Sequence, residues 1–415
     1  MRLAVKIGGW IKLQVIKADI AVVGGGPAGL SAAYSAAKSG ARVILLEKDD
    51  AIAQNIRTSG VTWTREINRL GISSEYYNPI SNYRFVSPSS EVLINGSGSE
   101  PQSCVLDVRK TWHHLASLAA AAGADIMLKT TVANITMDSG GRISGIKAKT
   151  MRGSVDIGCR LVIDASGFSS FVGRKAGIAS EWKRYGVGAE YECYCEHVDA
   201  DTWVLMVGKQ YSEAGYAWIF PLSKNRVRIG IGVGRPESKQ DPLDALNSMI
   251  EARLSPLDKM GKIQPIEFHY GFIPNQGLRK ASVSDGLILV GDSAGQSNPL
   301  VLEGIRYAIE FGRLAGEIGA KSLSENSSKE SLEDYQRIVK ANLESKINSA
   351  LKVQSRWLEL SDEQWDKELE ILRNMSLDEF LDFVKADFTA SKMMKLALHH
   401  PKLAARQLFN MVLKS

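Results

Sequence analysis

The sequence of 415 residues predicts an α/β protein with a three-layer, Rossmann-type domain, an inserted antiparallel β-sheet domain and a C-terminal helical region. Glycine-rich turns follow buried strand patterns at three places spread over most of the chain. Between the second and third turns the pattern changes to short alternating strands, and the C-terminal part is helical and charged. The predicted division is a discontinuous nucleotide-binding domain of residues 18–80, 104–184 and 285–326, a substrate domain of residues 81–103 and 185–284, and a helical region of residues 327–415.

Composition and charge exclude several classes of protein. Apolar residues make up 44% of the chain, and the formal net charge of +5 is mild. Acidic residues lie among the basic ones nearly everywhere, so we expect no nucleic-acid partner. No stretch approaches the ~20 apolar residues of a membrane span. Residues 1–17 lack a signal-peptide pattern, and they are either an additional strand or the product of a start codon placed too early.

The cysteines indicate a reducing compartment. Four of them are too few for a disulfide framework, and their spacing matches no zinc pattern. Cys193 and Cys195 would share one face of a strand as a reduced, partly buried pair. We therefore expect a cytoplasmic protein without a metal site. The four residues are Cys104, Cys159, Cys193 and Cys195.

The first glycine-rich turn is the sequence GGGPAG at residues 24–29. A buried strand pattern over residues 18–23 precedes it, and a predicted helix over 30–39 and a strand over 42–46 follow. Gly24 permits a tight turn, Gly26 allows a pyrophosphate to approach the backbone, and Gly29 allows helix and strand to pack closely. Glu47 follows at about the 20-residue spacing of a carboxylate that accepts ribose hydroxyls.

Two further turns follow buried strands later in the chain. DASGFSSFVGR occupies residues 164–174 after a strand over 160–163, and GDSAG occupies residues 291–295 after a strand over 286–290. Asp292 can accept hydroxyls of a sugar-like chain, and a helix beginning near residue 303 would present free N–H groups. One such turn indicates only a nucleotide. Three indicate a long dinucleotide held from end to end, and we predict FAD.

These turns, with Arg109 after a strand end at residues 106–109 and before a helix over 111–122, resemble a known FAD-dependent group. This para-hydroxybenzoate hydroxylase-like group includes aromatic hydroxylases, flavin halogenases and geranylgeranyl reductases, and the resemblance covers roughly residues 18–335. It implies that Arg109 and Asp292 contact the pyrophosphate and ribityl region of FAD. The candidate cofactor-binding residues are Gly24, Gly26, Ala28, Gly29, Glu47, Ser59, Gly60, Arg109, Ala133, Asp164, Gly167, Asp292, Gly304 and Ile305.

An aromatic strand distinguishes members of this group. The sequence GYAWIFP at residues 215–221 places Tyr216, Trp218 and Phe220 on one face. If the next strand sets Gly230 and Gly232 opposite them, a flat apolar slot opens. If the register slips by one residue, the aromatic rings are an ordinary core stripe packed on valine and isoleucine. The pattern resembles the Tyr-x-Trp-x-Phe-Pro signature of the geranylgeranyl reductases, including those of digeranylgeranylglycerophospholipid, whereas halogenases carry Trp-x-Trp-x-Ile-Pro.

Two departures from the family pattern concern the space beside the flavin. Many such reductases have a cysteine followed by glycines where this chain reads RTSG at residues 57–60, with Ser59 and no thiol. Many also have a glycine before the final Gly-Ile pair, where this chain has Leu302 and Glu303. These two side chains would narrow or recharge that space, so the substrate or the reaction can differ within the family.

The resemblance implies reduction of isoprenoid double bonds by hydride transfer from reduced flavin and protonation of the neighbouring carbon. Tyr216 and Trp218 are the candidate substrate wall, and Tyr216 could also relay a proton. The sequence has no second dinucleotide motif, so electrons would come from a ferredoxin-like carrier or from transient contact with NAD(P)H. Two alternatives stay open: an FAD monooxygenase or halogenase, and a flavoprotein that carries electrons to a quinone. The lack of a four-cysteine cluster argues against the iron–sulfur form of the latter.

The C-terminal stretch of residues 388–415 contains no acidic residue. Its basic residues alternate with apolar ones, and Pro401 separates two short amphipathic helices. A basic amphipathic end can bind an anionic membrane surface, which would place the protein peripherally on the inner face of the membrane. It is equally typical of a docked helix pair with a solvated basic face. The basic residues are Lys392, Lys395, Lys402, Arg406 and Lys414.

Overall fold

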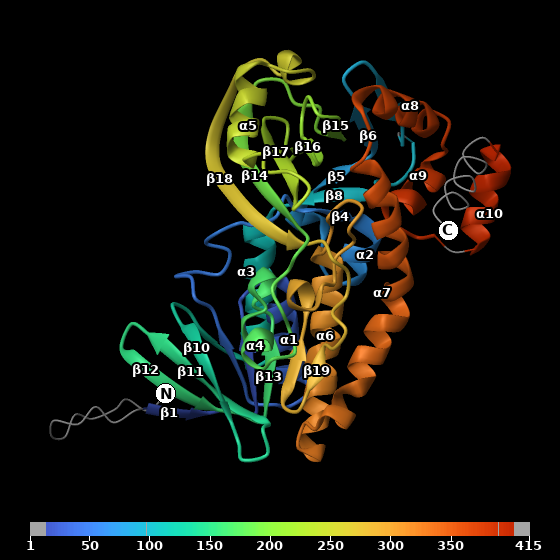
Figure 1. The fold of residues 1–415 in the computed structure, drawn as a ribbon. Helices are drawn as coiled ribbons and strands as arrows, with labels where there is room; N and C mark the ends of the chain where they lie inside the picture. Colours follow the sequence, from blue (N-terminus) through green and yellow to red (C-terminus); the bar gives the residue numbers. More distant parts are fainter. Residues whose placement is uncertain (1–13, 97, 389, 402–415) are drawn as a thin grey trace.

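The computed structural model describes residues 14–96, 98–388 and 390–401, and a six-stranded sheet of the predicted Rossmann type lies at its centre (Figure 1). Five strands run parallel in the order β20-β13-β2-β3-β9, and β19 pairs antiparallel with β20. Strands β2 and β3 are buried throughout, which explains their unbroken apolar sequences. The strands are β2 (Ile20–Val23), β3 (Val43–Leu46), β9 (Asp125–Met127), β13 (Leu161–Asp164), β19 (Val283–Ser284) and β20 (Leu287–Leu289).

Two layers cover the opposite faces of this sheet (Figure 1). Helices α1 (Pro27–Lys38), α3 (Val108–Ala121) and α6 (Ile305–Ser322) share one core cluster with Ile20 and Val22. On the other face, strands from the described residues form a sheet in the order β1-β12-β11-β10, which packs against Ala21 and Val23. Alternate side chains of β2 point to opposite faces of the central sheet, toward the helices on one side and toward the second sheet on the other. This arrangement is the predicted three-layer fold. The covering strands are β1 (Gln14–Lys17), β10 (Thr131–Met137), β11 (Ile143–Thr150) and β12 (Gly153–Gly158).

Two predicted elements differ from the structure. Helix α1 begins at Pro27 rather than at residue 30, because a proline fits the first turn of a helix. Arg109 lies in the first turn of α3 and not at a strand end, because the carboxylate of Asp107 accepts the backbone N–H of Lys110 and caps that helix.

A larger sheet stands beside the Rossmann layers (Figure 1). In the described part of the chain its order is β18-β14-β17-β16-β15-β6-β7, and every neighbouring pair is antiparallel except β15 and β6. Helix α5 (Pro242–Glu251) packs on one face through Leu246 and Met249. The strands are β6 (Asn82–Val86), β7 (Glu91–Ile94), β14 (Tyr185–Cys195), β15 (Thr202–Val207), β16 (Gly215–Pro221), β17 (Arg226–Arg235) and β18 (Ile263–Pro274).

Smaller elements connect the two sheets. Strands β4 (Val61–Trp63), β8 (Ser103–Leu106) and β5 (Tyr77–Ile80) pair antiparallel with β8 in the middle, within the residues that the structure describes. Helix α2 (Thr64–Arg69) directly follows β4, and α4 (Phe171–Lys175) follows the second glycine-rich turn. These elements place the loop around residue 59 between the Rossmann layers and the larger sheet.

The C-terminal helices bridge the two parts of the molecule (Figure 1). The long helix α7 packs through Tyr335 and Leu343 into the core of the Rossmann helices. Helices α8 and α9 pack through Trp365 and Phe380 against the face of the larger sheet opposite α5. The bounds are α7 (Lys329–Trp357), α8 (Asp362–Arg373), α9 (Leu377–Val384) and α10 (Ala390–His399).

The ends of the chain resolve part of what the sequence left open. Residues 14–17 form β1, parallel to β12, so this part of the N-terminal stretch is an additional strand. Residues 1–13 lie outside the described residues. Every helix in the described ranges is too short or too polar to cross a bilayer.

All four cysteines are free and buried. Cys193 and Cys195, two positions apart on β14, share the core cluster beneath α5. Burial raises the pKa of each of these two thiols to about 12. Both therefore stay protonated and pack as small apolar side chains.

Candidate active site

The three glycine-rich turns meet at the carboxyl edge of the parallel strands. Gly24, directly after β2, has a φ of +110°, a conformation that favours glycine. A Cβ on Gly24 would lie 2.3 Å from the backbone oxygen of Ala165 in the second turn. In the third turn, the hydroxyl of Ser293 donates to the backbone oxygen of Gly167 at 3.0 Å. Larger side chains at these positions would push the turns apart. The surface that they present at this edge therefore consists mainly of backbone atoms.

Two helix N-termini open at this edge. Gly26 precedes α1, and Gly304 precedes α6, which begins at Ile305. Among the described residues, neither terminus has a side-chain cap or an acid in its first turn. A Cβ built on Gly26 would meet nothing within 4 Å, so the backbone there is open to a ligand. Free N–H groups and the helix dipole suit such positions to phosphate and other electron-rich groups.

Glu47 lies beside the first turn, as its spacing predicted. Its Oε2 accepts the backbone N–H of Gly25 at 2.7 Å, and its Oε1 accepts that of Asp49 at 2.8 Å. These two donors fix the carboxylate against the glycine turn. Its remaining lone pairs are available to hydroxyl donors.

The two aspartates of the later turns have different environments. Asp164 is fully buried and accepts the backbone N–H groups of Ser166 at 3.0 Å and Gly173 at 2.8 Å. Its carboxylate holds the second turn together, and burial raises its pKa. Asp292 is half-buried, and no donor in the described ranges reaches its carboxylate. Burial raises the pKa of Asp292 to about 6, and a carboxylate left without a donor suits a ligand hydroxyl.

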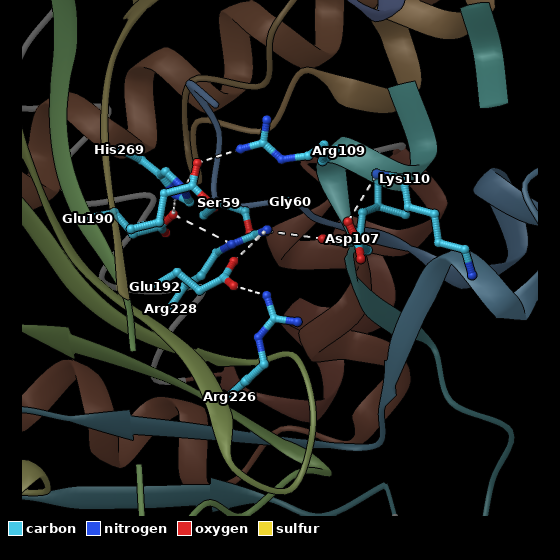
Figure 2. A network of polar contacts seen from close by, with 12 residues as sticks. Ser59, Gly60, Asp107, Arg109, Lys110, Glu190, Glu192, Arg226, Arg228 and His269 are labelled. Atoms are coloured by element: carbon cyan, nitrogen blue, oxygen red, sulfur yellow. Dashed lines mark hydrogen bonds and ion pairs between the residues drawn. The ribbon is translucent and has the colours of Figure 1, made fainter. Parts of the chain in front are cut away.

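Arg109, Ser59 and Gly60 lie where the larger sheet approaches α3 and the loop before β4 (Figure 2). The Arg109 guanidinium donates to the backbone oxygen of Ala53 at 2.6 Å and pairs with Glu267 at 2.5 Å. The backbone oxygen of Ser59 accepts from Arg228 at 2.8 Å. Arg109 thus ties α3 to β18, and Arg228 ties β17 to the loop before β4.

The edge where the three glycine-rich turns meet is called the nucleotide edge below. Two further predicted residues, Ala28 and Ala133, were expected to contact the cofactor there. Ala28 lies in the first turn of α1, and a Cβ on Gly291 would come within 3.0 Å of its side chain, so the first and third turns touch there. Ala133 lies at a register shift of β10, between Val132 and Asn134. Its predicted backbone contact with the cofactor stays a prediction.

A cavity of about 1310 Å³ runs from this edge to the C-terminal helices. Ser59, Gly304 and Ile305 line one end, and Trp357, Phe383 and Leu396 line the other. Ligand pockets usually have volumes of about 300–1,000 Å³, so this one suits a long ligand. The lining between the two ends is largely aromatic and aliphatic, which suits an apolar chain.

The aromatic strand β16 forms one wall of this cavity. Its register with β17 shows whether the glycines or the branched residues of β17 lie opposite the aromatic rings. Tyr216 pairs with Gly232, and Trp218 pairs with Gly230, so the glycines do lie opposite the aromatic residues. The room they create is filled by the Trp218 indole, which a Cβ on Gly230 would approach to 2.4 Å. Trp218 stacks on Phe220 with ring centroids 5.9 Å apart and planes 14° apart. The result is a flat wall and not an empty slot.

Tyr216 is held by the loop before α6. Its hydroxyl donates to the backbone oxygen of Val301 at 2.7 Å, and burial raises its pKa far above the ordinary value. Its ring contacts the Trp218 ring edge-on at 5.9 Å. The hydroxyl therefore joins the aromatic wall to the loop that leads to Gly304.

The two departures in that loop have different consequences. Leu302 has a φ of +50°, which is uncommon for a non-glycine residue. Its side chain lies against β14, where a Cβ on Gly186 would come within 2.9 Å of Leu302 Cδ1, and it lines the cavity. Glu303 is buried, and its carboxylate pairs with Arg306 at 2.9 Å. Leu302 thus lines the cavity, whereas the charge of Glu303 is balanced by Arg306.

Sequence reasoning missed a buried polar network next to the wall (Figure 2). Glu190 and Glu192 on β14, Arg228 on β17 and His269 on β18 point toward one another between the strands. Trp218 Nε1 donates to Glu190 at 2.7 Å. The signal was present in the sequence as charged residues at alternate positions of otherwise apolar strands. Their partners come from strands far apart in the chain, so the pairing could not be read.

The described part of the basic tail is docked. Lys392 of α10 pairs with Asp382 and Asp387 at 2.6 Å each, and His399 Nδ1 lies 2.6 Å from Glu379 of α9. Leu396 lines the far end of the cavity. The second predicted amphipathic helix falls within residues 402–415, outside the described residues.

Comparisons with known proteins agree on one family. The model of the FAD dependent oxidoreductase family matches residues 19–206, and that of the geranylgeranyl reductase catalytic domain matches residues 185–273. The chain is 30% identical over 385 residues to digeranylgeranylglycerophospholipid reductase 1 of Methanococcoides burtonii, covering 90% of this chain and 92% of that protein. It is 31% identical over 378 residues to digeranylgeranylglycerophospholipid reductase of Methanocaldococcus jannaschii, covering 89% and 95%.

Solved structures give the same picture. A geranylgeranyl bacteriochlorophyll reductase-like protein from Thermoplasma acidophilum superposes with a TM-score of 0.84 at 26% identity, covering 95% of this chain and 99% of that one. A flavin-dependent brominase superposes with a TM-score of 0.67 at 18% identity, covering 94% and 99%. The second likeness is one of fold alone.

Proposed function

The chain belongs to the digeranylgeranylglycerophospholipid reductase family, and we propose that it reduces the carbon–carbon double bonds of geranylgeranyl chains in a membrane lipid. It is an FAD-dependent oxidoreductase. The observation that carries the proposal is the long apolar cavity, which begins at Gly304 beside the nucleotide edge and continues past the aromatic wall. An apolar cavity of this volume, lined from the nucleotide edge to the C-terminal helices, suits an extended isoprenoid chain better than a compact aromatic substrate.

The nucleotide edge fits FAD. Gly26 would admit the pyrophosphate to the N-terminus of α1, Glu47 would accept ribose hydroxyls, and Asp292 would accept a hydroxyl of the ribityl chain. The N-terminus of α6 at Gly304 would face the electron-rich end of the flavin. Bound and reduced, FAD supplies the two electrons of the reaction as a hydride.

The chain's own residues would orient the substrate and exclude water. The stacked rings of Trp218 and Phe220 present a flat face against which a trisubstituted alkene can lie. Aromatic faces also stabilise cationic character that develops on an alkene carbon during protonation. Leu302 adds an apolar side chain to the cavity lining near the nucleotide edge, where it would contact an isoprenoid chain.

The direct test is a single turnover under anaerobic conditions. The purified FAD-loaded protein is reduced with dithionite and mixed with a phospholipid that carries two geranylgeranyl chains. We expect the flavin to be reoxidised and the lipid product to be heavier by two hydrogens, which is what one reduced flavin and one proton supply. If the flavin is reoxidised only after oxygen is admitted, and no saturated product forms, the result would instead support the monooxygenase or halogenase alternative.

The electron donor and the membrane contact belong to the same proposal. We infer that a ferredoxin-like carrier or NAD(P)H reduces the flavin, which steady-state turnover with each donor distinguishes. We also infer that the basic residues beyond α10 bind anionic lipid, because residues 388–415 contain no acid. Flotation with anionic vesicles tests this by comparing the full chain with its Lys402→Glu, Arg406→Glu, Lys414→Glu variant. Equal flotation of the two would contradict the membrane contact.

A further inference from the structure

A chain of polar side chains leads from the molecular surface to the aromatic wall. Glu267 on β18 has 37% of its side chain exposed, and its Oε1 lies 3.6 Å from His269 Nε2. His269 Nδ1 lies 2.8 Å from Glu190 Oε1 (Figure 2). Glu190 Oε2 accepts Trp218 Nε1–H at 2.7 Å. The side chains of His269 and Glu190 are only 3% and 4% exposed, and both line the cavity. A buried titratable pair therefore borders the space proposed for the substrate.

The charged side chains around the His269–Glu190 pair are equal in number of either sign when His269 is neutral. Glu267 pairs with Arg109 of α3 at 2.5 Å. Arg228 lies 3.8 Å from Glu190 and 3.4 Å from Glu192. The facing groups are Glu190 and Glu192 from β14, Trp218 from β16, Arg226 and Arg228 from β17, Glu267 from β18 and Arg109 from α3. Three carboxylates thus meet three guanidinium groups, and His269 can gain or lose a proton without leaving any of them unpaired.

The orientation of the His269 imidazole suits it to accept a proton through one ring nitrogen and to release one through the other. Among the described residues, the buried Nε2 of His269 has no hydrogen-bond partner. A neutral imidazole donates through one nitrogen, whereas an imidazolium donates through both. Because carboxylates lie beyond both nitrogens, the protonated ring can donate to Glu190 through Nδ1 and approach Glu267 through Nε2. This position suits a group that passes a proton between the two sides.

The other acid in the wall is less suited to this task. The Tyr216 proton is donated to the backbone oxygen of Val301, and burial raises the pKa of that hydroxyl. Giving up this proton would leave a phenolate against a carbonyl oxygen. His269 and Glu190 have no such restriction.

We propose that the His269–Glu190 pair is the acid of the reaction, and this inference rests on the proposed function. Bound and reduced FAD would supply a hydride to one alkene carbon. As the π bond breaks, the neighbouring carbon takes the proton held by the pair. The hydride carries two electrons, so two C–H bonds replace the π bond. Glu267, which reaches solvent, returns a proton to His269 for the next cycle.

The test compares Glu190→Gln and His269→Gln with Glu192→Gln as the matched control. The Glu192 side chain is as buried as that of Glu190, with 3% of it exposed. It pairs with arginines and not with His269 or Trp218. The probe is anaerobic single turnover of the FAD-loaded protein with a phospholipid that carries two geranylgeranyl chains. We expect both test variants to reoxidise about 10²–10⁴-fold more slowly, the range of general acid catalysis, with unchanged FAD content and lipid binding. We expect Glu192→Gln to unfold more easily but to lose far less of the rate than the two test variants, and its turnover should still fall as pH rises.

A measurement on the native chain keeps the test independent of folding in the variants. Carbon-13 histidine labelling follows the titration of His269 by NMR, assigned by the signal that His269→Gln lacks. We expect the turnover rate to fall as pH rises through that titration and to be lower in D₂O.

Two results would overturn the inference. One is a native rate that does not follow the His269 titration and is equal in D₂O. The other is native-like turnover in both Glu190→Gln and His269→Gln. If the native chain itself yields no saturated lipid, the proposed function fails, and this inference fails with it.

Discussion

The nucleotide edge and the apolar cavity are neighbours, yet they bind through different parts of the chain. At the edge, three turns approach so closely that Gly24 would clash with Ala165 if it carried a side chain, and helix N–H groups face the ligand. Along the cavity, the surface consists of side chains such as Trp218 and Leu302. The comparison indicates that the edge tolerates few substitutions because it is backbone, whereas the cavity can change its substrate by exchanging side chains.

The largest effect is expected at the nucleotide edge. Gly24→Ala forces a Cβ to within 2.3 Å of a backbone oxygen at a φ of +110°, so we expect loss of bound FAD and destabilisation by about 3 kcal/mol. Gly26→Ala is the matched control, since its Cβ would meet nothing within 4 Å. It should fold normally and show only weaker FAD binding. Flavin absorbance per chain and urea unfolding measure both, and equal stability losses would break the contrast.

On the cavity side, Trp218→Ala should separate catalysis from cofactor binding. Removing the indole leaves the alkene without a flat support and removes the donor to Glu190 Oε2, so we expect about 100-fold slower alkene reduction with FAD still bound. Trp218→Phe keeps an aromatic face but loses the N–H, and it should recover part of the rate. Single-turnover reoxidation measures both variants. Unchanged turnover in Trp218→Ala would remove the wall from the proposal.

The same contrast explains how far sequence reasoning reached. The turns at Gly24 and Asp292 could be predicted because local spacing after a buried strand encodes a backbone shape. The pairing of Trp218 with Gly230 could not, because a one-residue slip of the hairpin is equally compatible with the alternation. The contact between Glu190 and His269 joins strands far apart in the chain, and no local pattern specifies it.

Asp292 tests whether the edge contains a carboxylate held ready for the cofactor. Burial raises its pKa to about 6, above its value in the unfolded chain, so the native state binds more protons between about pH 4 and pH 6. The stability of the FAD-free protein should therefore fall as pH rises through this window, by at most about 1 kcal/mol per pH unit. Asp292→Asn should flatten that fall. Urea unfolding at several pH values measures the free energy of unfolding of both proteins. Identical pH profiles for the native protein and Asp292→Asn would contradict a raised pKa of Asp292.

The smallest and most selective effect is expected at Leu302, where the two regions meet. Its left-handed φ of +50° costs about 1 kcal/mol relative to glycine, and its side chain lines the cavity beside Gly186. Leu302→Gly should relieve the strain, lose the apolar contact and leave stability within about 1 kcal/mol of the native value. Its expected signature is a severalfold shift of kcat/KM toward bulkier prenyl lipids. Leu302→Asn relieves the same strain while keeping most of the volume, so it should not shift selectivity. A shift in both variants would mean that loop conformation, and not side-chain bulk, sets the width of the cavity.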